Sequence, residues 1–356
     1  MTYLRKSGTT RTAVLIINMV LFSTAGNLTF GQDTINSADN NLSGDHISVK
    51  NVNSIVVDRD NIKWFSTDVG IVSFDGKTWK AHKDIKNIPT QNLNSLTYVA
   101  HSESAELWIS SSDGATVTRL PMNEQSEALT YNTENASLSS QNVLGIAAGL
   151  DSTRWIGTDK GVAALSNEKW LTPDYAMYYT ERMFTEYPIT SMATNLKGDT
   201  LYIATEGIGI ARVYRDNLDG ISGASVYAQW GPIELPSDYV LCIYIAPDGT
   251  KWFGTEEGAA RHWGNNTLDN WTAFTTENGL VDNFVQAIGG DLEGNIWFGT
   301  QAGISVFSGS SWTSYTTDDG LLSLQILSIA TDLNGVVWIG TDLGISSFEK
   351  GNFTSY

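Results

Sequence analysis

Cysteine and histidine are nearly absent from this chain. Its 356 residues contain one cysteine, Cys242, so no disulfide can form within the chain. The four histidines, at positions 46, 82, 101 and 262, are not spaced as metal ligands, so neither a zinc site nor a Ser-His-Asp relay is predicted. Stability must therefore come from packing, and the sequence assigns no catalytic residue.

Basic residues are also few. Lysine and arginine together number 21, against 39 aspartates and glutamates, which gives a formal net charge of −18. A surface this acidic repels phosphate backbones and anionic lipid headgroups. Nucleic acid and membrane surfaces are therefore excluded as expected partners, whereas cations, neutral glycans and basic protein surfaces fit the charge.

Long apolar stretches are missing as well, apart from a short one near the N-terminus. The ten residues from Ala13 to Phe22 are mostly apolar, three basic residues precede them, and the small-x-small triplet Ser23–Ala25 follows. This run is about half as long as a membrane-spanning helix needs to be. The pattern predicts a secretory signal peptide over residues 1–32, with cleavage after Ala25 or after Gln32.

The remaining chain divides into a short leader and one repetitive region. Residues 33–44 are predicted to be flexible, and the repeats run from 45 to 356. No later stretch approaches about 20 apolar residues, so no membrane insertion is expected. The predicted location is the periplasm or the cell exterior.

A repeated aromatic motif dominates this region. An aromatic residue is followed by an apolar, a small and a hydroxyl residue seven times, at intervals of 41 to 50 residues; these aromatic residues are Trp64, Trp108, Trp155, Tyr202, Trp252, Trp297 and Trp338. A period of this length is typical of one propeller blade. The motif strand carries no charge on either face, which predicts burial on both faces and radial stacking.

One repeat predicts one four-stranded antiparallel blade. Between Val285 and Thr316, four short runs suited to strands alternate with turn residues. A second aromatic column is expected on the fourth strand, at Trp79, Tyr131, Trp170, Trp230, Trp271, Trp312 and Phe353. The sequence therefore predicts an all-β, seven-bladed β-propeller. We expect the ring to close by face packing, with a latching strand from residues 36–49 as the alternative.

The unit around Trp297 carries a series of short motifs. It reads Asp-Leu-Glu-Gly-Asn-Ile-Trp-Phe-Gly-Thr over 291–300, Gly-Ile-Ser-Val-Phe over 303–307, Trp-Thr-Ser-Tyr over 312–315 and Asp-Gly-Leu over 319–321. This series resembles the two-component regulator propeller repeat. The resemblance covers residues 45–356 and is weakest in the units of Trp108 and Tyr202.

This resemblance implies an extracytoplasmic, sensor-type propeller. In that family such repeats form sensing regions of bacterial receptor kinases that commonly respond to polysaccharide fragments. The present sequence shows one ring and no kinase, so the resemblance implies a binding module and carries over no catalytic residue. The implied partners are a glycan or protein ligand and a membrane receptor kinase.

Two groups of aromatic residues are candidates for ligand binding. The link between Pro173 and Pro188 is unusually aromatic for a connection that should face water, and insertions of this kind often lie on the binding face. Packing over the edges of neighbouring blades is the alternative. Trp263 lies outside both aromatic columns, and Tyr227, Trp230 and Tyr239 extend the predicted patch. The candidate residues are Tyr175, Tyr178, Tyr179, Phe184, Tyr187 and Trp263.

Acidic residues recur four positions after the repeat aromatic. The residues there are Asp68, Ser112, Asp159, Glu206, Glu256, Gln301 and Asp342. They either cap their own turns or form an acidic rim at one mouth of the central channel, where a divalent cation would be the only cofactor. The turns at Asp58, Asp291 and Asp332 superficially resemble calcium loops but lack the glutamate at the twelfth position.

Three functions fit these features. The first is a secreted, non-enzymatic propeller that binds a glycan or a protein on the face of the inter-blade links. The second is an extracytoplasmic polysaccharide lyase or glycoside hydrolase that uses the acidic rim. The third is a scaffold that docks on a membrane receptor.

Overall fold

The computed structural model describes residues 41–42, 48–123, 125–149, 153–171, 187–216, 220–228, 234–264 and 269–356. The predicted signal peptide lies outside these residues. So does the aromatic link, apart from Tyr187 and Pro188 at its end. No helix in the described part of the chain has the length and apolarity needed to cross a membrane.

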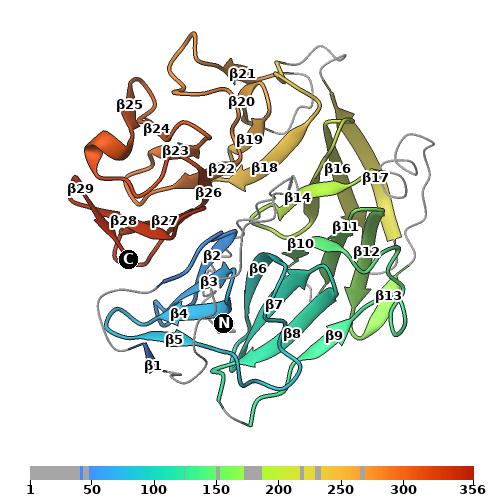
Figure 1. The fold of residues 1–356 in the computed structure, drawn as a ribbon. Helices are drawn as coiled ribbons and strands as arrows, with labels where there is room; N and C mark the ends of the chain where they lie inside the picture. The colour runs from blue at the N-terminus through green and yellow to red at the C-terminus, as the bar shows by residue number, and fades with distance from the viewer. Residues whose placement is uncertain are drawn as a thin grey trace, which may run out of the picture.

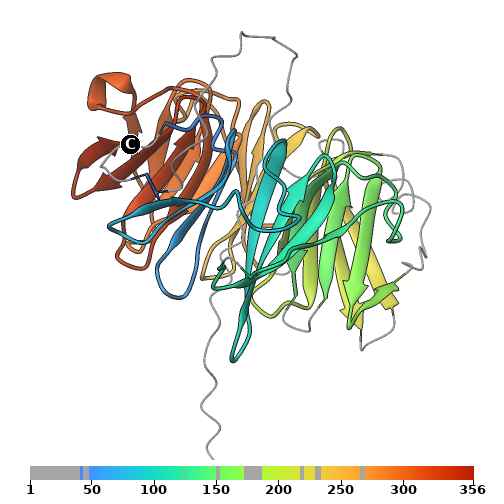
Figure 2. The ribbon, with the colours of Figure 1, turned by 60° about the horizontal axis from the view of Figure 1, so that its bottom comes forward.

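In the described residues, seven antiparallel sheets surround a common centre (Figure 1). Within each sheet four consecutive strands pair in sequence order, with the first strand innermost. Figure 2 shows the sheets from the side, standing next to one another around the ring. The chain is therefore a seven-bladed β-propeller with four-stranded antiparallel blades, as the repeat predicts.

The first four blades occupy the N-terminal part of the ring. Blade 1 contains β2 (Ser54–Val57), β3 (Lys63–Thr67), β4 (Gly70–Phe74) and β5 (Trp79–Ala81). Blade 2 contains β6 (Leu93–Ala100), β7 (Ala105–Ser111), β8 (Gly114–Leu120) and β9 (Leu129–Tyr131). Blade 3 contains β10 (Val143–Ala148), β11 (Arg154–Thr158), β12 (Gly161–Ser166) and β13 (Lys169–Leu171). Blade 4 contains β14 (Ile189–Thr194), β15 (Thr200–Thr205), β16 (Ile210–Asp216) and β17 (Gly220–Tyr227).

The last three blades complete the ring. Blade 5 contains β18 (Val240–Ile245), β19 (Lys251–Thr255), β20 (Gly258–His262) and β21 (Trp271–Phe274). Blade 6 contains β22 (Ala287–Gly290), β23 (Ile296–Gly299), β24 (Ile304–Phe307) and β25 (Trp312–Tyr315), followed by the 3-10 turn η1 (Thr317–Asp319). Blade 7 contains β26 (Ile326–Thr331), β27 (Val337–Thr341), β28 (Ile345–Glu349) and β29 (Asn352–Ser355).

The small residue of the motif lets neighbouring blades approach closely. A Cβ atom added to Gly254 would come within 2.4 Å of the Val285 carbonyl oxygen on the next blade, and one added to Gly299 would come within 2.5 Å of Ile326 Cγ2. The apolar residue before the glycine is fully buried, as in Phe253. Burial on both faces of the second strand thus follows from the motif, as predicted.

The ring closes with the same contact that joins its other blades. The backbone nitrogen of Val52 donates to Thr341 O across the junction of blades 7 and 1 at 3.0 Å, and Val285 donates to Thr255 O in the same way at 2.9 Å. Strand β1 (Asn41–Leu42) pairs with β5 at the outer edge of blade 1. Closure is therefore by face packing, and this added strand does not join blade 7.

The predicted second aromatic column needs correction in two blades. In blade 1 Trp79 occupies this column and pairs with Phe74 of the third strand. In blade 2 the pairing of Val117 with Leu129 puts Ala128, one residue earlier, at the position equivalent to Trp79. Tyr131 instead pairs with Ala115 and stacks on Trp108. In blade 4 the position equivalent to Trp79 is occupied by Ala224, and Trp230 lies outside the described residues. Spacing from the motif cannot reveal such shifts, because β8 and β16 are longer than the corresponding strands of other blades.

Candidate functional site

The turn between the second and third strands is held by the hydroxyl of the motif. Thr300 Oγ1 donates to Gly303 O at 2.8 Å and accepts from the backbone nitrogen of Ala302 at 3.0 Å. The same arrangement occurs at Thr67, Ser111, Thr158, Thr255 and Thr341, and in a turn one residue longer at Thr205. Because the hydroxyl makes the hydrogen bonds of the turn, the side chain of the next residue is not needed to hold the turn.

The inner strands are tied to one another by a ring of side-chain hydrogen bonds. A polar residue near the start of one inner strand donates to a backbone carbonyl of the next blade at six of the seven junctions. The pairs are Asn53 with Leu93, Asn94 with Val143, Thr190 with Val240, Cys242 with Val285, Gln286 with Ile326, and Ser328 with Val52. At the remaining junction blade 3 has Leu144 and Gly145 there, whose side chains carry no donor. These bonds fix the inner strands around the axis.

A cavity of about 240 Å³ opens where the inner strands of blades 4 to 7 begin. Motif turns contribute Glu206, Glu256 and Gln301 to its wall. Links between blades and inner strands supply the other polar and aromatic groups, namely Tyr239, Phe284, Gln325, Thr190 and Gln286. The motif turns and the inter-blade links therefore share one face, here called the link face, and this space is the link-face cavity.

Negative charge concentrates at this cavity. Partial burial, reinforced by the neighbouring charges of Glu206 and Glu257, raises the pKa of Glu256. Tyr239 lies between the two turns, because it forms a β-bridge with Glu206 and its carbonyl accepts from the Glu256 backbone nitrogen at 3.3 Å. Its side chain is 45% exposed. The cavity thus combines carboxylates, amides and one accessible aromatic ring.

Three other acidic residues of the predicted rim bind neighbouring chain segments. Asp68 accepts from the backbone nitrogen of Lys50 at 2.7 Å, and Asp342 accepts from the Ser323 hydroxyl at 2.5 Å. Asp159 accepts from the Asn142 amide, one residue before β10. The structure therefore brings Glu206, Glu256 and Gln301 together and gives these three aspartates contacts with the inter-blade links.

The predicted aromatic candidates do not share one surface. Tyr187 lies two residues before β14, on the link face. Trp263 follows β20 at the opposite end of the blade, where its side chain is 39% exposed and the Arg261 guanidinium lies 4.7 Å from its ring centre. Tyr227 is 2% exposed, so it packs in the core and does not extend a surface patch.

Four predicted contact residues, Tyr175, Tyr178, Tyr179 and Phe184, lie outside the described residues. Sequence reasoning missed Thr190, Gln286, Phe284 and Gln325 as cavity residues. The signal that could have identified Thr190 and Gln286 is a polar residue directly after an apolar one where an inner strand begins. Within the described residues, no three His, Cys, Asp or Glu side chains are grouped to hold a metal ion.

Known structures with this fold include extracellular domains of two-component systems and an enzyme. The extracellular domain of BT3049 from B. thetaiotaomicron, described as a hybrid two-component system, is 22% identical over 85% of this chain and 39% of its own length, with a TM-score of 0.68. The corresponding domain of BT4673 is 19% identical over 87% and 39%, with a TM-score of 0.60. Virginiamycin B lyase from Staphylococcus aureus is 13% identical over 83% and 92%, with a TM-score of 0.59.

These similarities establish the fold. No protein-family model matches this chain, and no curated protein matches it in sequence. The chain spans about two fifths of the length of these two extracellular domains. The resemblance predicted from the repeats is confirmed at the level of structure, and the lyase shows that the same fold also serves an enzyme.

Proposed function

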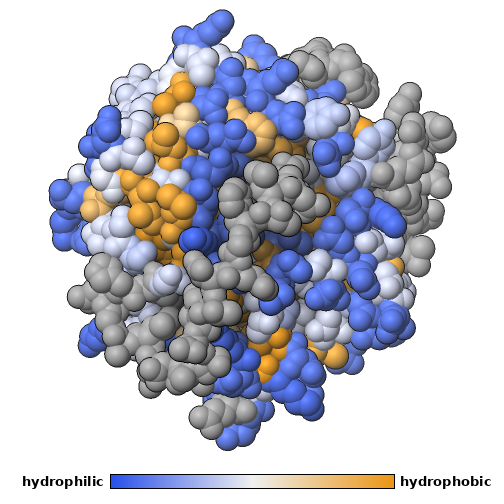
Figure 3. Space-filling view, in the orientation of Figure 1, coloured by the Kyte–Doolittle hydropathy of each residue, from blue (hydrophilic) through white to orange (hydrophobic). Residues whose placement is uncertain are grey.

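We propose that this chain is a non-enzymatic binding module that holds a glycan in the link-face cavity. The observation that carries the proposal is the convergence of three glutamine amides, two carboxylates and Tyr239 on one small cavity. Amides and carboxylates bind sugar hydroxyls, and an exposed aromatic ring offers a face for a pyranose. Figure 3 shows one face of the molecule, where hydrophilic side chains predominate and apolar ones form separate patches. A protein ligand is the alternative occupant.

Calorimetry with a panel of soluble oligosaccharides tests the site. We expect one oligosaccharide to bind and its affinity to fall at least tenfold in Gln301→Ala and in Tyr239→Ala. Trp263→Ala, on the opposite face, should leave the affinity unchanged. If Trp263→Ala abolishes binding while the two cavity variants bind normally, the ligand occupies the other face and the proposal fails.

The aromatic link remains part of this proposal. Tyr187 places the end of the link on the link face. We expect the link to add contacts to a ligand larger than the cavity. Joint replacement of Tyr178, Tyr179 and Phe184 by alanine should weaken the binding of long oligosaccharides more than that of short ones. Equal effects on both lengths would contradict this role.

The alternative function is a polysaccharide lyase or glycoside hydrolase. It is favoured by the raised pKa of Glu256 next to Glu206, because a general acid must keep its proton near neutral pH. Incubation with polysaccharides, with and without a chelator, would release products if this function is correct. Loss of turnover in Glu256→Gln would then assign the acid and replace the binding-only proposal.

We also propose a location in the periplasm or outside the cell, with a receptor kinase as partner. The BT3049 and BT4673 neighbours support this location because both are extracellular domains. N-terminal sequencing of the protein from fractionated cells should show a chain that begins after Ala25 or Gln32. Co-purification with a membrane kinase tests the partner.

A further inference from the structure

In three blades an aspartate directly follows the first strand, organises the first turn and also binds the repeat tryptophan. In blade 7, Asp332 Oδ1 accepts from the backbone nitrogens of Asn334 and Val336, and Oδ2 accepts from Trp338 Nε1 at 3.2 Å. Asp58 and Asp291 make the same three bonds, with indole distances of 2.9 Å. These contacts explain why the turns resemble calcium loops in sequence.

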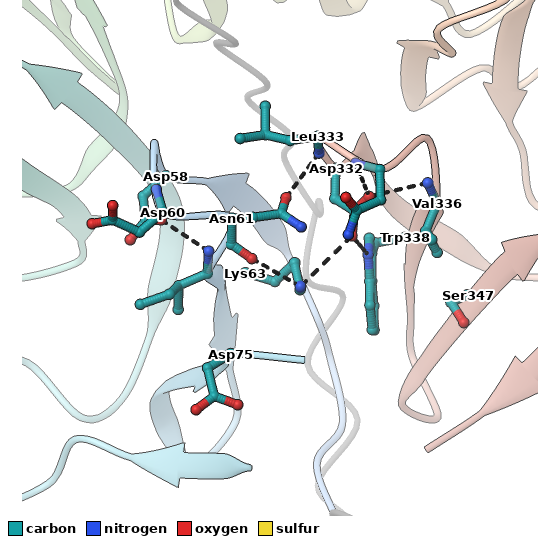
Figure 4. Close-up of polar contacts among 12 residues, drawn as sticks. Asp58, Asp60, Asn61, Lys63, Asp75, Asp332, Leu333, Val336, Trp338 and Ser347 are labelled. Atoms are coloured by element: carbon teal, nitrogen blue, oxygen red, sulfur yellow. Dashed lines mark hydrogen bonds and ion pairs between the residues drawn. The ribbon is translucent and has the colours of Figure 1, made fainter. Parts of the chain in front are cut away.

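Two of the three aspartates also interact with a fourth donor, which comes from a lysine or an asparagine side chain. Lys63 Nζ of blade 1 lies 3.6 Å from Asp332 Oδ2, and both side chains are 3% exposed (Figure 4). In blade 6 the donor is the Asn295 amide, 2.8 Å from Asp291 Oδ2.

Asp58 differs because no fourth donor reaches it among the described residues. Ile62 stands where blade 6 has Asn295, and Leu107 of blade 2 stands where blade 1 has Lys63. Asp58 is nevertheless 6% exposed. In Figure 4 it lies on the side of blade 1 away from Asp332, where it faces blade 2.

A cavity of about 270 Å³ lies at this place between blades 1 and 2. Asp58 and Trp64 contribute from blade 1, and Tyr98, Leu120 and Met122 contribute from blade 2. All except Leu120 are more than nine-tenths buried. The buried part of the wall therefore joins one carboxylate to an indole, a phenol, the His82 imidazole, the Ser73 hydroxyl and aliphatic groups.

The aromatic columns explain why this junction is open. Phe307 and Phe348 pack against the motif tryptophan of the preceding blade, with ring centres 6.1 and 5.0 Å apart. Blade 2 has Thr118 at the corresponding position, and Ala128 replaces the second aromatic. No ring from blade 2 therefore packs on Trp64 in the described residues, and its ring contact there is with His82 of its own blade.

The closing junction shows which chemical group fits such a site. There the primary ammonium of Lys63 lies 5.4 Å from the ring centres of both Phe74 and Trp338 while it pairs with Asp332. A carboxylate and a tryptophan face together stabilise a cation more than either does alone. The net charge of −18 also attracts cations to the surface.

We propose that the cavity between blades 1 and 2 binds an aliphatic primary ammonium group from outside the chain. Asp58 is the counter-ion, Trp64 provides the cation–π face, and Tyr98, Leu120 and Met122 enclose the carbon chain. At the rim, the exposed cations Arg59 and Lys80 are balanced by the exposed Asp60 and Asp75. The ammonium group comes from a free alkylamine or from a lysine side chain of a partner.

Calorimetry at constant ionic strength tests this site with n-butylammonium chloride as the probe. We expect one binding site per chain and no comparable heat with sodium chloride. Ile62→Asn should weaken binding at least tenfold, because it supplies Asp58 with the donor that Asn295 supplies to Asp291. Leu292→Asn, in the corresponding turn of blade 6, is the matched control and should bind normally.

A second variant keeps the test decisive if the first one fails to fold. Leu107→Lys places a lysine where blade 1 has Lys63, so its own ammonium should occupy the cavity and abolish probe binding. Wild-type protein that shows no binding, or equal binding by wild type and a folded Ile62→Asn or Leu107→Lys variant, would overturn the proposal. A lysine amide that binds at least tenfold more tightly than n-butylammonium would identify a lysine side chain as the source. If the lysine amide binds equally or more weakly, the source is a free amine.

Discussion

At the residue scale, the hydroxyl that ends the motif explains one of its invariant features. Each hydroxyl both donates and accepts within the turn, and it is buried in all seven blades. A valine has the same shape as threonine but leaves the turn amide without an acceptor and removes one of the donors to the turn carbonyl. The requirement is therefore local and chemical, and it applies equally in every blade.

Thr300→Val should lower the free energy of unfolding by about 1–3 kcal/mol. The loss arises because the Ala302 backbone nitrogen loses its acceptor, and Gly303 O keeps only the Thr300 backbone nitrogen as a donor. Urea denaturation measures the change, with Thr313→Val on the exposed strand β25 as the control. Equal stabilities of the two variants would contradict the role of the hydroxyl.

His82 should make stability depend on pH. Burial, reinforced by the positive charge of Lys80, lowers the pKa of His82 from 6.5 to about 4. The unfolded chain therefore binds more protons than the folded chain between these values. The stabilising contribution is complete above pH 6.5 and is lost as pH falls through about 4, by up to roughly 3 kcal/mol.

The variant His82→Phe isolates this contribution. It places in blade 1 the ring that Phe274 provides in blade 5, where it stacks on Trp252. The wild type should lose more stability than His82→Phe between pH 7 and pH 4 when both are measured by thermal unfolding. Parallel stability profiles would show that His82 does not titrate with folding.

At the scale of the blade, the spacing of the motif predicts strand order but does not fix the register of the fourth strand. The motif aromatic and the two residues after it belong to the second strand, whose neighbours lie a few residues away, so their environment follows from local sequence. The fourth strand depends on the length of the hairpin before it. In blade 2 the longer hairpin moves Tyr131 out of its predicted column and places Ala128 there.

Gly340→Ala should destabilise the ring at its closure. An added Cβ would come within 2.4 Å of Val52 O, and backbone in a packed junction cannot move without cost. Overpacking of this kind costs about 1–3 kcal/mol. Urea unfolding measures it, with Ser314→Ala on exposed β25 as the control. A Gly340→Ala variant as stable as this control would contradict close packing at the junction.

At the scale of the whole molecule, closure joins residues that lie as many as 276 positions apart in the sequence. Ser328 donates to Val52 O at 2.7 Å, and Lys63 pairs with Asp332 in the same junction. Since the pair is buried, removing one partner leaves the other charge without compensation. Such long-range contacts form only when all seven blades are in place.

Lys63→Met should lower the free energy of unfolding by about 3 kcal/mol. Asp332→Asn should cost a similar amount, and the double variant less than the sum of the two, because each single variant leaves its partner buried alone. Lys350→Met, which removes an exposed pair with Glu349, is the matched control and should change nothing measurable. Additive effects of the two closure variants would show that Lys63 and Asp332 do not interact.

The sequence alone determined the number of blades, their four-stranded build and the buried motif strand, because each depends on residues close together in the chain. It also identified the turn positions from which Glu206, Glu256 and Gln301 reach the link-face cavity. Only the tertiary structure decided which of those positions meet, that Tyr187 and Trp263 lie at opposite ends of their blades, and that Asp58 lacks the donor found at Asp291 and Asp332. These outcomes depend on contacts between blades, and a repeat pattern carries no information about which side chain of one blade fills the space beside the next.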